Sequence, residues 1–255
     1  GESIKLHNGV FMSNHYHLLI TPFDQRVLGD FMRDVNSALA KELGLIHDFH
    51  GHLWHTKYKA SPVLDEVALE ERYRYIFKNS IKENLVEHPR DWPGLHAYRS
   101  ICEGEVVKGI WINRTALYQA RERAQRKKNK GKPKPKESDH TTELTLTLDG
   151  PPPLWEGMSE GVYKAHCQVL ADEVIAECAA LRRQEGKEVL GVKGILTEEV
   201  INPRLTQRSA RPLCHAVCPD ALKAFKEQYR AFIVLFFEAS IHLREHVACH
   251  CCTPE

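Results

Sequence analysis

Two histidines one residue apart, His15 and His17, have a spacing that could hold a metal ion. They lie in the segment FMSNHYHLLI (11–20), and residues i and i+2 of a strand share one face of a sheet. Both imidazoles would therefore point the same way and could converge on one cation. With 15 histidines in 255 residues, such a pair is expected roughly once by chance. A second pair, at 50–52, flanks a glycine in a stretch typical of a turn. The neighbouring residues must therefore show whether His15 and His17 form a metal site or only line a strand.

A tyrosine and an asparagine on a predicted helix (65–86) could complete such a site. Tyr75 and Asn79 are four residues apart and share one helical face, whereas Tyr73 points to a different side. If this helix packs on the strand, two imidazoles, an amide oxygen and a phenol meet at one point. Two nitrogen ligands and an oxygen, with open positions, suit Mg²⁺ or Mn²⁺. Tyr75 would then be a nucleophile that attacks phosphorus and forms a covalent tyrosyl phosphate.

The hydrophobic pattern predicts the elements that must position these residues. Two strands joined through Ser13-Asn14 form an antiparallel hairpin, and the next helix has Asp24 as its N-cap and Gly44 just past its end. The predicted strands and extended segments are 3–12, 15–22, 53–64 and 144–155. The predicted helices are 24–44, 65–86, 159–186 and 219–245. The fold class is therefore α+β, an antiparallel sheet with packed helices followed by a mainly helical C-terminal unit.

Two of these helices are assigned from apolar residues at helical spacing. In the helix 159–186 the predicted buried stripe comprises Val162, Val169, Leu170, Val174, Ile175 and Leu181. In the helix 219–245 it comprises Phe225, Tyr229, Phe232, Ile233 and Phe236. The predicted organisation is a catalytic domain (1–118), a basic linker (119–143) and a helical extension (144–255).

Charge is distributed unevenly along the chain. The net charge is only +1, which gives no general preference for nucleic acid or a membrane. The stretch QARERAQRKKNKGKPKPK (119–136), however, carries nine Lys/Arg against one Glu. Such a run cannot fold alone, and it is typical either of a solvated linker or of a segment that contacts a nucleic-acid backbone.

The location is expected to be the cytoplasm. The sequence opens Gly-Glu-Ser without the charged and apolar regions of a signal peptide, and its eight cysteines are unevenly spaced. Reduced thiols are the default for such a protein. The longest apolar run, AFIVLFF (231–237), is too short to span a bilayer, so no membrane partner is expected.

Several separated motifs together resemble a known family, the HUH-superfamily single-tyrosine transposases. The likeness is closest to the REP-associated tyrosine transposases of bacteria, and it covers about residues 5–118. The main motifs are Asn14-His15-Tyr16-His17-Leu18-Leu19-Ile20 and Arg74-Tyr75-Ile76-x-x-Asn79. The flanking motifs are Gly51-His52-Leu53-Trp54, Tyr58-Lys59-Ala60, Leu85-Val86 and Trp92-Pro93. Residues 144 to about 245, including Arg211–Ala216, resemble the C-terminal extension of longer members.

This resemblance implies a ferredoxin-like HUH nuclease fold and a specific reaction. The enzyme would cleave and rejoin single-stranded, hairpin-forming DNA through a 5′-phosphotyrosine, and it would be associated with the nucleoid. The implied nucleophile is Tyr75, and the implied Mg²⁺ or Mn²⁺ ligands are His15, His17 and Asn79. Candidate phosphate contacts are Lys57, Lys59, Arg72 and Arg74. A homodimer is also compatible, because in related enzymes the tyrosine helix can come from a partner subunit.

The sequence departs from the family pattern in two places. The family's catalytic domain begins with a strand and a helix before the histidine hairpin, whereas this sequence begins at the hairpin. A sheet without that strand would expose an edge, and the sequence would be a fragment or a decayed copy. Ser80 stands where the family commonly has a proline after the asparagine.

The sequence is also compatible with two other functions. One is a catalytically silent protein that binds hairpin DNA with the same fold. The other is an interaction module stabilised by zinc, bound by Cys214, His215 and Cys218 together with the cysteines and histidine of 249–252. A separate group of histidines, at positions 47, 50, 52 and 55, lacks regular ligand spacing.

Overall fold

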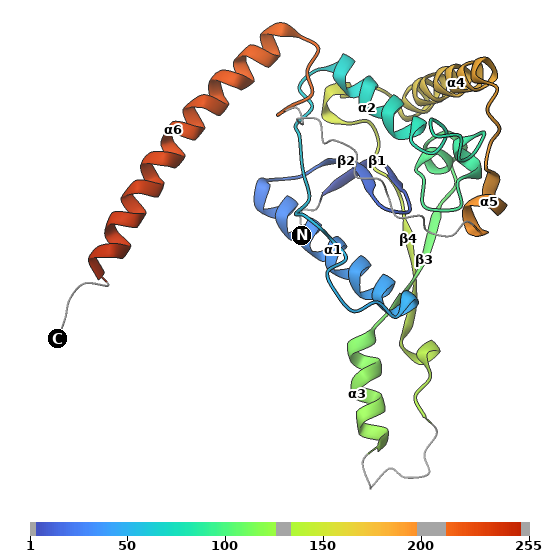
Figure 1. Ribbon diagram of the computed structural model, residues 1–255, viewed down its shortest axis with the longest axis horizontal. Helices are drawn as coiled ribbons and strands as arrows, with labels where there is room; N and C mark the ends of the chain where they lie inside the picture. The colour runs from blue at the N-terminus through green and yellow to red at the C-terminus, as the bar shows by residue number, and fades with distance from the viewer. Residues whose placement is uncertain (1–3, 126–133, 198–212, 251–255) are drawn as a thin grey trace.

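The computed structural model describes residues 4–125, 134–197 and 213–250, the last eight by their backbone alone (Figure 1). It confirms the α+β class: two small antiparallel sheets are combined with long helices. In chain order the main elements are β1 (Lys5–Phe11), β2 (Tyr16–Thr21), α1 (Gln25–His47), α2 (Glu66–Lys78), β3 (Val107–Ile112), α3 (Arg114–Gln125), β4 (Thr141–Leu146), α4 (Glu160–Glu185), α5 (Gly191–Thr197) and α6 (Pro219–His250). Short helical turns lie at Pro89–Asp91, Arg99–Glu103, Glu137–His140 and Pro153–Trp155.

The predicted histidine hairpin is confirmed. Strands β1 and β2 pair antiparallel, with Val10 opposite His17, and the amide of Met12 donates to the carbonyl of His15 at 2.8 Å to close the turn. Among the described residues β2 pairs only with β1, so β2 is an edge strand.

The expected single antiparallel sheet does not form within the described residues. Strands β3 and β4 make a second two-stranded sheet, and the far edge of β1 is covered by irregular chain. There the amide of Phe11 donates to Leu95 at 2.9 Å and the amide of Ala97 donates to Gly9 at 2.8 Å. Backbone polar groups that would otherwise be buried without partners are satisfied in this way without a regular third strand.

Helix α1 begins as predicted but ends later. Its N-cap is Asp24, whose carboxylate accepts from the amide of Val27 at 2.7 Å. The predicted end at Gly44 is wrong, because the helix continues to His47 and the left-handed cap residue is Asp48, at φ 47°. Asp is one of the few residues other than glycine that visit this conformation readily, so a glycine was not needed.

Helix α2 is shorter than predicted. Asp65 caps it through the amide of Ala68 at 2.8 Å, but the helix ends at Lys78 and not near residue 86. Residues 79–84 form successive tight turns, including an amide-to-carbonyl bond from Asn79 to Ile76 at 3.2 Å. The polar Asn79 and Ser80 interrupt a pattern that otherwise continues with helical spacing. The segment 53–64, predicted as extended, contains only an isolated bridge from Val63 to His215.

One core joins parts of the chain that were expected to lie in separate domains. The hydroxyls of Tyr73 on α2 and Tyr163 on α4 lie 2.9 Å apart inside this core. Its buried members are Leu69, Tyr73, Phe77, Ala97, Tyr98, Ile101, Trp155, Tyr163, Cys167, Leu170 and Ala171. The predicted linker 119–143 likewise connects β3 to β4, which pair with each other. The predicted boundaries at 118 and 143 therefore do not separate two cores.

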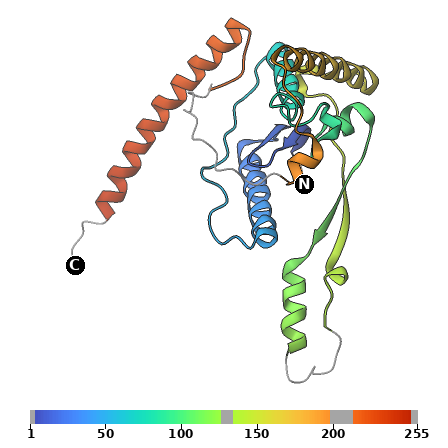
Figure 2. The same cartoon turned by 45° about the vertical axis from the view of Figure 1, so that its right-hand side comes forward.

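The predicted faces of the last two long helices are partly wrong. Helix α4 buries Leu170 and Val174 as expected, but Val162, Val169 and Leu181 are about half exposed. The positions buried in addition are Tyr163, Cys167, Ala171 and Cys178. Helix α6 stands apart from the body in both views (Figures 1 and 2), and none of its described side chains is buried. Within the described residues, no helix combines the length and the apolar content that a membrane span requires.

Candidate active site

The structure brings the predicted nucleophile to the predicted histidine pair within one chain. The imidazoles of His15 and His17 lie edge to face, with ring centroids 5.1 Å apart. Helix α2 places the ring of Tyr75 5.0 Å from that of His17. The phenolic oxygen of Tyr75 lies 3.4 Å from Nε2 of His17, a distance at the outer limit of a hydrogen bond.

Asn79 is the fourth member of this group. Its backbone keeps helical angles (φ −60°, ψ −40°), so it remains one turn from Tyr75 although the helix ends one residue earlier. The side chain is 1% exposed, and its Nδ2 has no hydrogen-bond partner. The amide interacts with His15, and since Nδ2 is unpartnered we assign the contact to the oxygen. A buried unpartnered polar atom costs about 1–3 kcal/mol and is retained mainly where function requires it.

The environment keeps His15 in the neutral form that binds metals. Burial lowers the pKa of this imidazole, the hydrogen bond with Asn79 partly offsets the effect, and the charge of Lys82 lowers it further. Nδ1 of His15 lies 2.6 Å from the side-chain oxygen of Asn14. In the neutral ring a proton on Nδ1 donates to that oxygen and Nε2 carries a lone pair that a cation could use, so the hydrogen bond to the oxygen of Asn79 belongs to the protonated ring.

The three candidate ligands could hold a divalent cation only if ligands from outside the chain completed its coordination. Among the described residues no group of three or more His, Cys, Asp or Glu side chains converges on one point. Two imidazoles and the oxygen of Asn79 would hold three positions, and water or phosphate oxygens would have to supply the others. Such an open site suits a metal that acts on a substrate rather than a structural ion.

A lysine that was not predicted lies beside Tyr75, the predicted nucleophile. The ammonium group of Lys82 is 4.9 Å from the ring centroid of Tyr75. No salt bridge of the described residues involves Lys82, whereas its neighbours Lys78 and Arg182 pair with carboxylates of Glu177 and Glu87. Tyr75, Asn79 and Lys82 are spaced i, i+4, i+7, so helical periodicity could have identified this lysine.

The four predicted phosphate contacts have different surroundings. The guanidinium of Arg72 lies 5.4 Å from the ring centroid of Tyr75, at the site, and makes a longer salt bridge of 3.7 Å with Glu71. Arg74 instead points to α4, where it forms a salt bridge with Glu173, so its charge is already paired. Lys57 and Lys59 are exposed on the chain that follows α1.

The zinc hypotheses gain no support from the described part of the chain. Cys214 is buried and Cys218 is exposed, and the backbone of His215 pairs with Val63. Their predicted co-ligands at 249–252 fall outside the described side chains. The four histidines at 47, 50, 52 and 55 are all described, and they form no such cluster.

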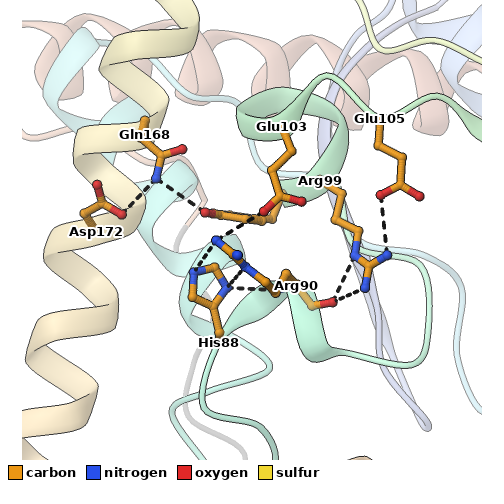
Figure 3. A network of polar contacts seen from close by, with 8 residues as sticks. His88, Arg90, Arg99, Glu103, Glu105, Gln168 and Asp172 are labelled. Atoms are coloured by element: carbon orange, nitrogen blue, oxygen red, sulfur yellow. Dashed lines mark hydrogen bonds and ion pairs between the residues drawn. The ribbon is translucent and has the colours of Figure 1, made fainter.

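A second polar cluster has a structural explanation (Figure 3). It links the chain between His88 and Glu105 to α4, and its two arginines are paired with Glu103 and Glu105. Arg90 lies 3.2 Å from the carboxylate of Glu103, and Arg99 donates to the carbonyl of Arg90. Burial and then Arg90 lower the pKa of His88. The cluster holds in place the segment that covers the edge of β1, and nothing in it resembles an open catalytic site.

Comparisons with known proteins do not identify the chain: no protein-family model, no curated protein and no solved structure matches it. The class that the fold and the site define is an α+β protein in which two histidines, a tyrosine and an asparagine converge. The resemblance to HUH transposases therefore depends on the motifs and on this convergence.

Proposed function

We propose that this protein is a metal-dependent tyrosine transposase or nuclease that cleaves and rejoins single-stranded hairpin DNA. The observation that carries the proposal is the approach of Tyr75 to His17, with a phenol oxygen 3.4 Å from Nε2, beside His15 and Asn79. Two strands and a helix that are distant in sequence must fold together to produce it. A tyrosine that served only packing would not need its hydroxyl beside one imidazole, with a second imidazole and a buried amide next in line.

The reaction would be a transesterification at phosphorus. The oxygen of Tyr75 attacks a backbone phosphate, the bond from phosphorus to the 3′-oxygen breaks, and a 5′-phosphotyrosine forms. The phenol proton passes to solvent, and the released 3′-oxygen takes a proton from water. Attack by a 3′-hydroxyl on the phosphotyrosine then rejoins a strand, with no external energy source.

The remaining side chains would bind and orient the phosphate. His15, His17 and Asn79 would hold Mg²⁺ or Mn²⁺, which supplies Lewis-acid stabilisation of the phosphoryl charge when bound. Lys82 and Arg72 border the tyrosine ring at 4.9 and 5.4 Å and would contact non-bridging oxygens. The ferredoxin-like HUH topology belongs to the same proposal.

Formation of a covalent adduct tests this function. The full chain is incubated with Mn²⁺ and a labelled hairpin oligonucleotide, and a protein–DNA species that survives denaturation is expected. Tyr75→Phe should abolish it, whereas Tyr73→Phe, two residues away on the opposite face of α2, should retain it. If the wild type binds the hairpin but forms no adduct, the protein is the catalytically silent hairpin-binding protein and the proposed chemistry is wrong.

Metal binding can be tested without catalysis. Titration of Mn²⁺ followed by electron paramagnetic resonance should show one site in the wild type. The double variant His15→Ala, His17→Ala should lose it, whereas His47→Ala, which alters an exposed histidine of α1, should not. Equal binding by all three proteins would remove the metal from the proposal.

A further inference from the structure

Helix α6 presents a regular apolar stripe that no described part of its own chain covers. Its residues Leu222, Phe225, Tyr229, Phe232, Phe236 and Ala239 alternate at spacings of three and four. This is the a/d pattern of a coiled coil, sustained over more than two heptads. The side chains of the stripe also lie next to one another, since the ring of Phe225 stacks on that of Tyr229 and the ring of Phe232 lies 6.1 Å from that of Phe236 in a tilted pair.

The exposure of this stripe is unusual for a helix. Phe232 is 58% exposed and Phe236 is 55% exposed, and the flanking Leu235 is 64% exposed. No described side chain of α6 is buried, and the helix stands clear of the body (Figures 1 and 2). Helices in proteins obtain most of their stability from packing an apolar face, and monomeric proteins rarely leave large apolar patches in water.

We propose that α6 pairs with the α6 helix of a second copy of this chain and makes the protein a homodimer. The a/d stripe is self-complementary, because each knob on one helix requires the same repeat on the helix that faces it. A membrane is a poorer occupant, since α6 is 32 residues long but its described part contains no stretch apolar enough for a span. The N-terminal half of the opposite face is polar, with Lys223, Glu227 and Arg230, as expected for the solvent side of a two-stranded coil.

Hydrogen bonds attach the residues just before α6 to the rest of the chain, so pairing of two α6 helices would join two whole protomers. One carboxylate oxygen of Asp65 caps α2, and the other accepts from the amides of Val217 and Cys218 at 2.7 and 3.0 Å. The amide of His215 also donates to Pro62 at 2.8 Å. A pair of α6 helices would therefore connect the two α2 helices through short, hydrogen-bonded joints. The inference does not rest on the proposed function.

Molar mass measured by light scattering during size-exclusion chromatography tests this pairing on the full chain. The wild type should have twice the chain mass of 29.2 kDa. Phe232→Glu with Phe236→Glu, at a d and an a position, should give the monomer. The matched control is Val234→Glu, which alters an equally exposed residue (55%) on the opposite side of the same helix and should leave the dimer intact.

Three outcomes would overturn the proposal. A monomeric wild type across the concentration range would mean that the stripe is covered by its own chain or left bare. A dimer that persists in the double variant would place the interface elsewhere. Dissociation by Val234→Glu as strongly as by the double variant would mean that α6 is buried on all sides, which a two-helix pair cannot do. Circular dichroism of each variant checks that α6 remains helical.

Discussion

The two faces of α2 carry tyrosines two residues apart that have opposite surroundings. Tyr73 is fully buried, lies 2.9 Å from the hydroxyl of Tyr163, and its pKa is raised strongly by burial. Tyr75 is half-buried among imidazoles and cations. The same side chain is therefore a core residue on one face and a candidate nucleophile on the other. The face of the helix, rather than the residue type, determines the role.

The largest expected effect comes from disrupting the buried face. Tyr73→Ala removes a ring that contacts Trp155 and Tyr163 and should lower the free energy of unfolding by about 3–5 kcal/mol. Urea denaturation followed by tryptophan fluorescence measures this loss. Tyr75→Ala is the matched variant and should cost far less. Equal losses would mean that both faces of α2 are structural.

A pH effect of similar size is expected from His96, which stacks on Phe77 of the same buried face. Burial lowers the pKa of His96 from 6.5 to about 4. Between these values the unfolded chain binds a proton that the folded chain does not, so stability falls as the pH falls from 6.5 to 4. Protonation of His96 in the unfolded chain therefore lowers the free energy of unfolding by about 3 kcal/mol at pH 4 and has little effect above pH 6.5.

The variant His96→Asn checks this contribution. Its amide oxygen can accept from the amide of Tyr98, as Nδ1 of His96 does at 3.1 Å, but it does not titrate. Its free energy of unfolding should decline less steeply than that of the wild type between pH 6.5 and 4. Parallel declines would show that His96 does not carry the acid sensitivity.

On the site face, His17→Ala should reduce adduct formation by about 100-fold, the upper end of the loss seen when groups that only support a metal's ligands are removed. The free energy of unfolding should change by less than 1 kcal/mol, because the imidazole is only half-buried. A quench assay with labelled hairpin DNA measures the rate. A large loss of stability with unchanged rate would assign His17 to packing.

Lys82→Met should slow adduct formation about tenfold, equivalent to about 1.4 kcal/mol of lost charge stabilisation. Lys82→Arg should recover part of the rate, because it restores the charge. Lys78→Met is the control, since that ammonium group is paired with Glu177 at 3.5 Å and should matter little. Equal slowing by both methionine variants would indicate a general loss of positive charge.

The smallest effect is expected from Arg74→Ala. Its salt bridge with Glu173 lies at the surface, so the free energy of unfolding should fall by less than about 1 kcal/mol. Hairpin binding, measured by fluorescence anisotropy, should not change, whereas Arg72→Ala should weaken it. Weaker binding by Arg74→Ala would restore the sequence prediction that this arginine contacts phosphate.

Short-range patterns predicted much of the site. The i, i+2 spacing of His15 and His17 placed them on the hairpin, and the four-residue spacing kept Tyr75 and Asn79 together even though α2 ends at Lys78. Lys82 was missed, although its spacing from Tyr75 fits the same face. The pairing of Arg74 could not have been predicted, because Glu173 lies about a hundred residues away on α4.

The amino-acid sequence by itself determined the α+β class, the histidine hairpin and the faces of α2, because periodicities of two and 3.6 residues depend only on local backbone geometry. Tertiary structure alone decided that α4 shares a core with α2, that the described strands form two sheets, and that no described side chain of α6 is buried. These outcomes depend on burial between segments far apart in the chain, for which local spacing carries no information.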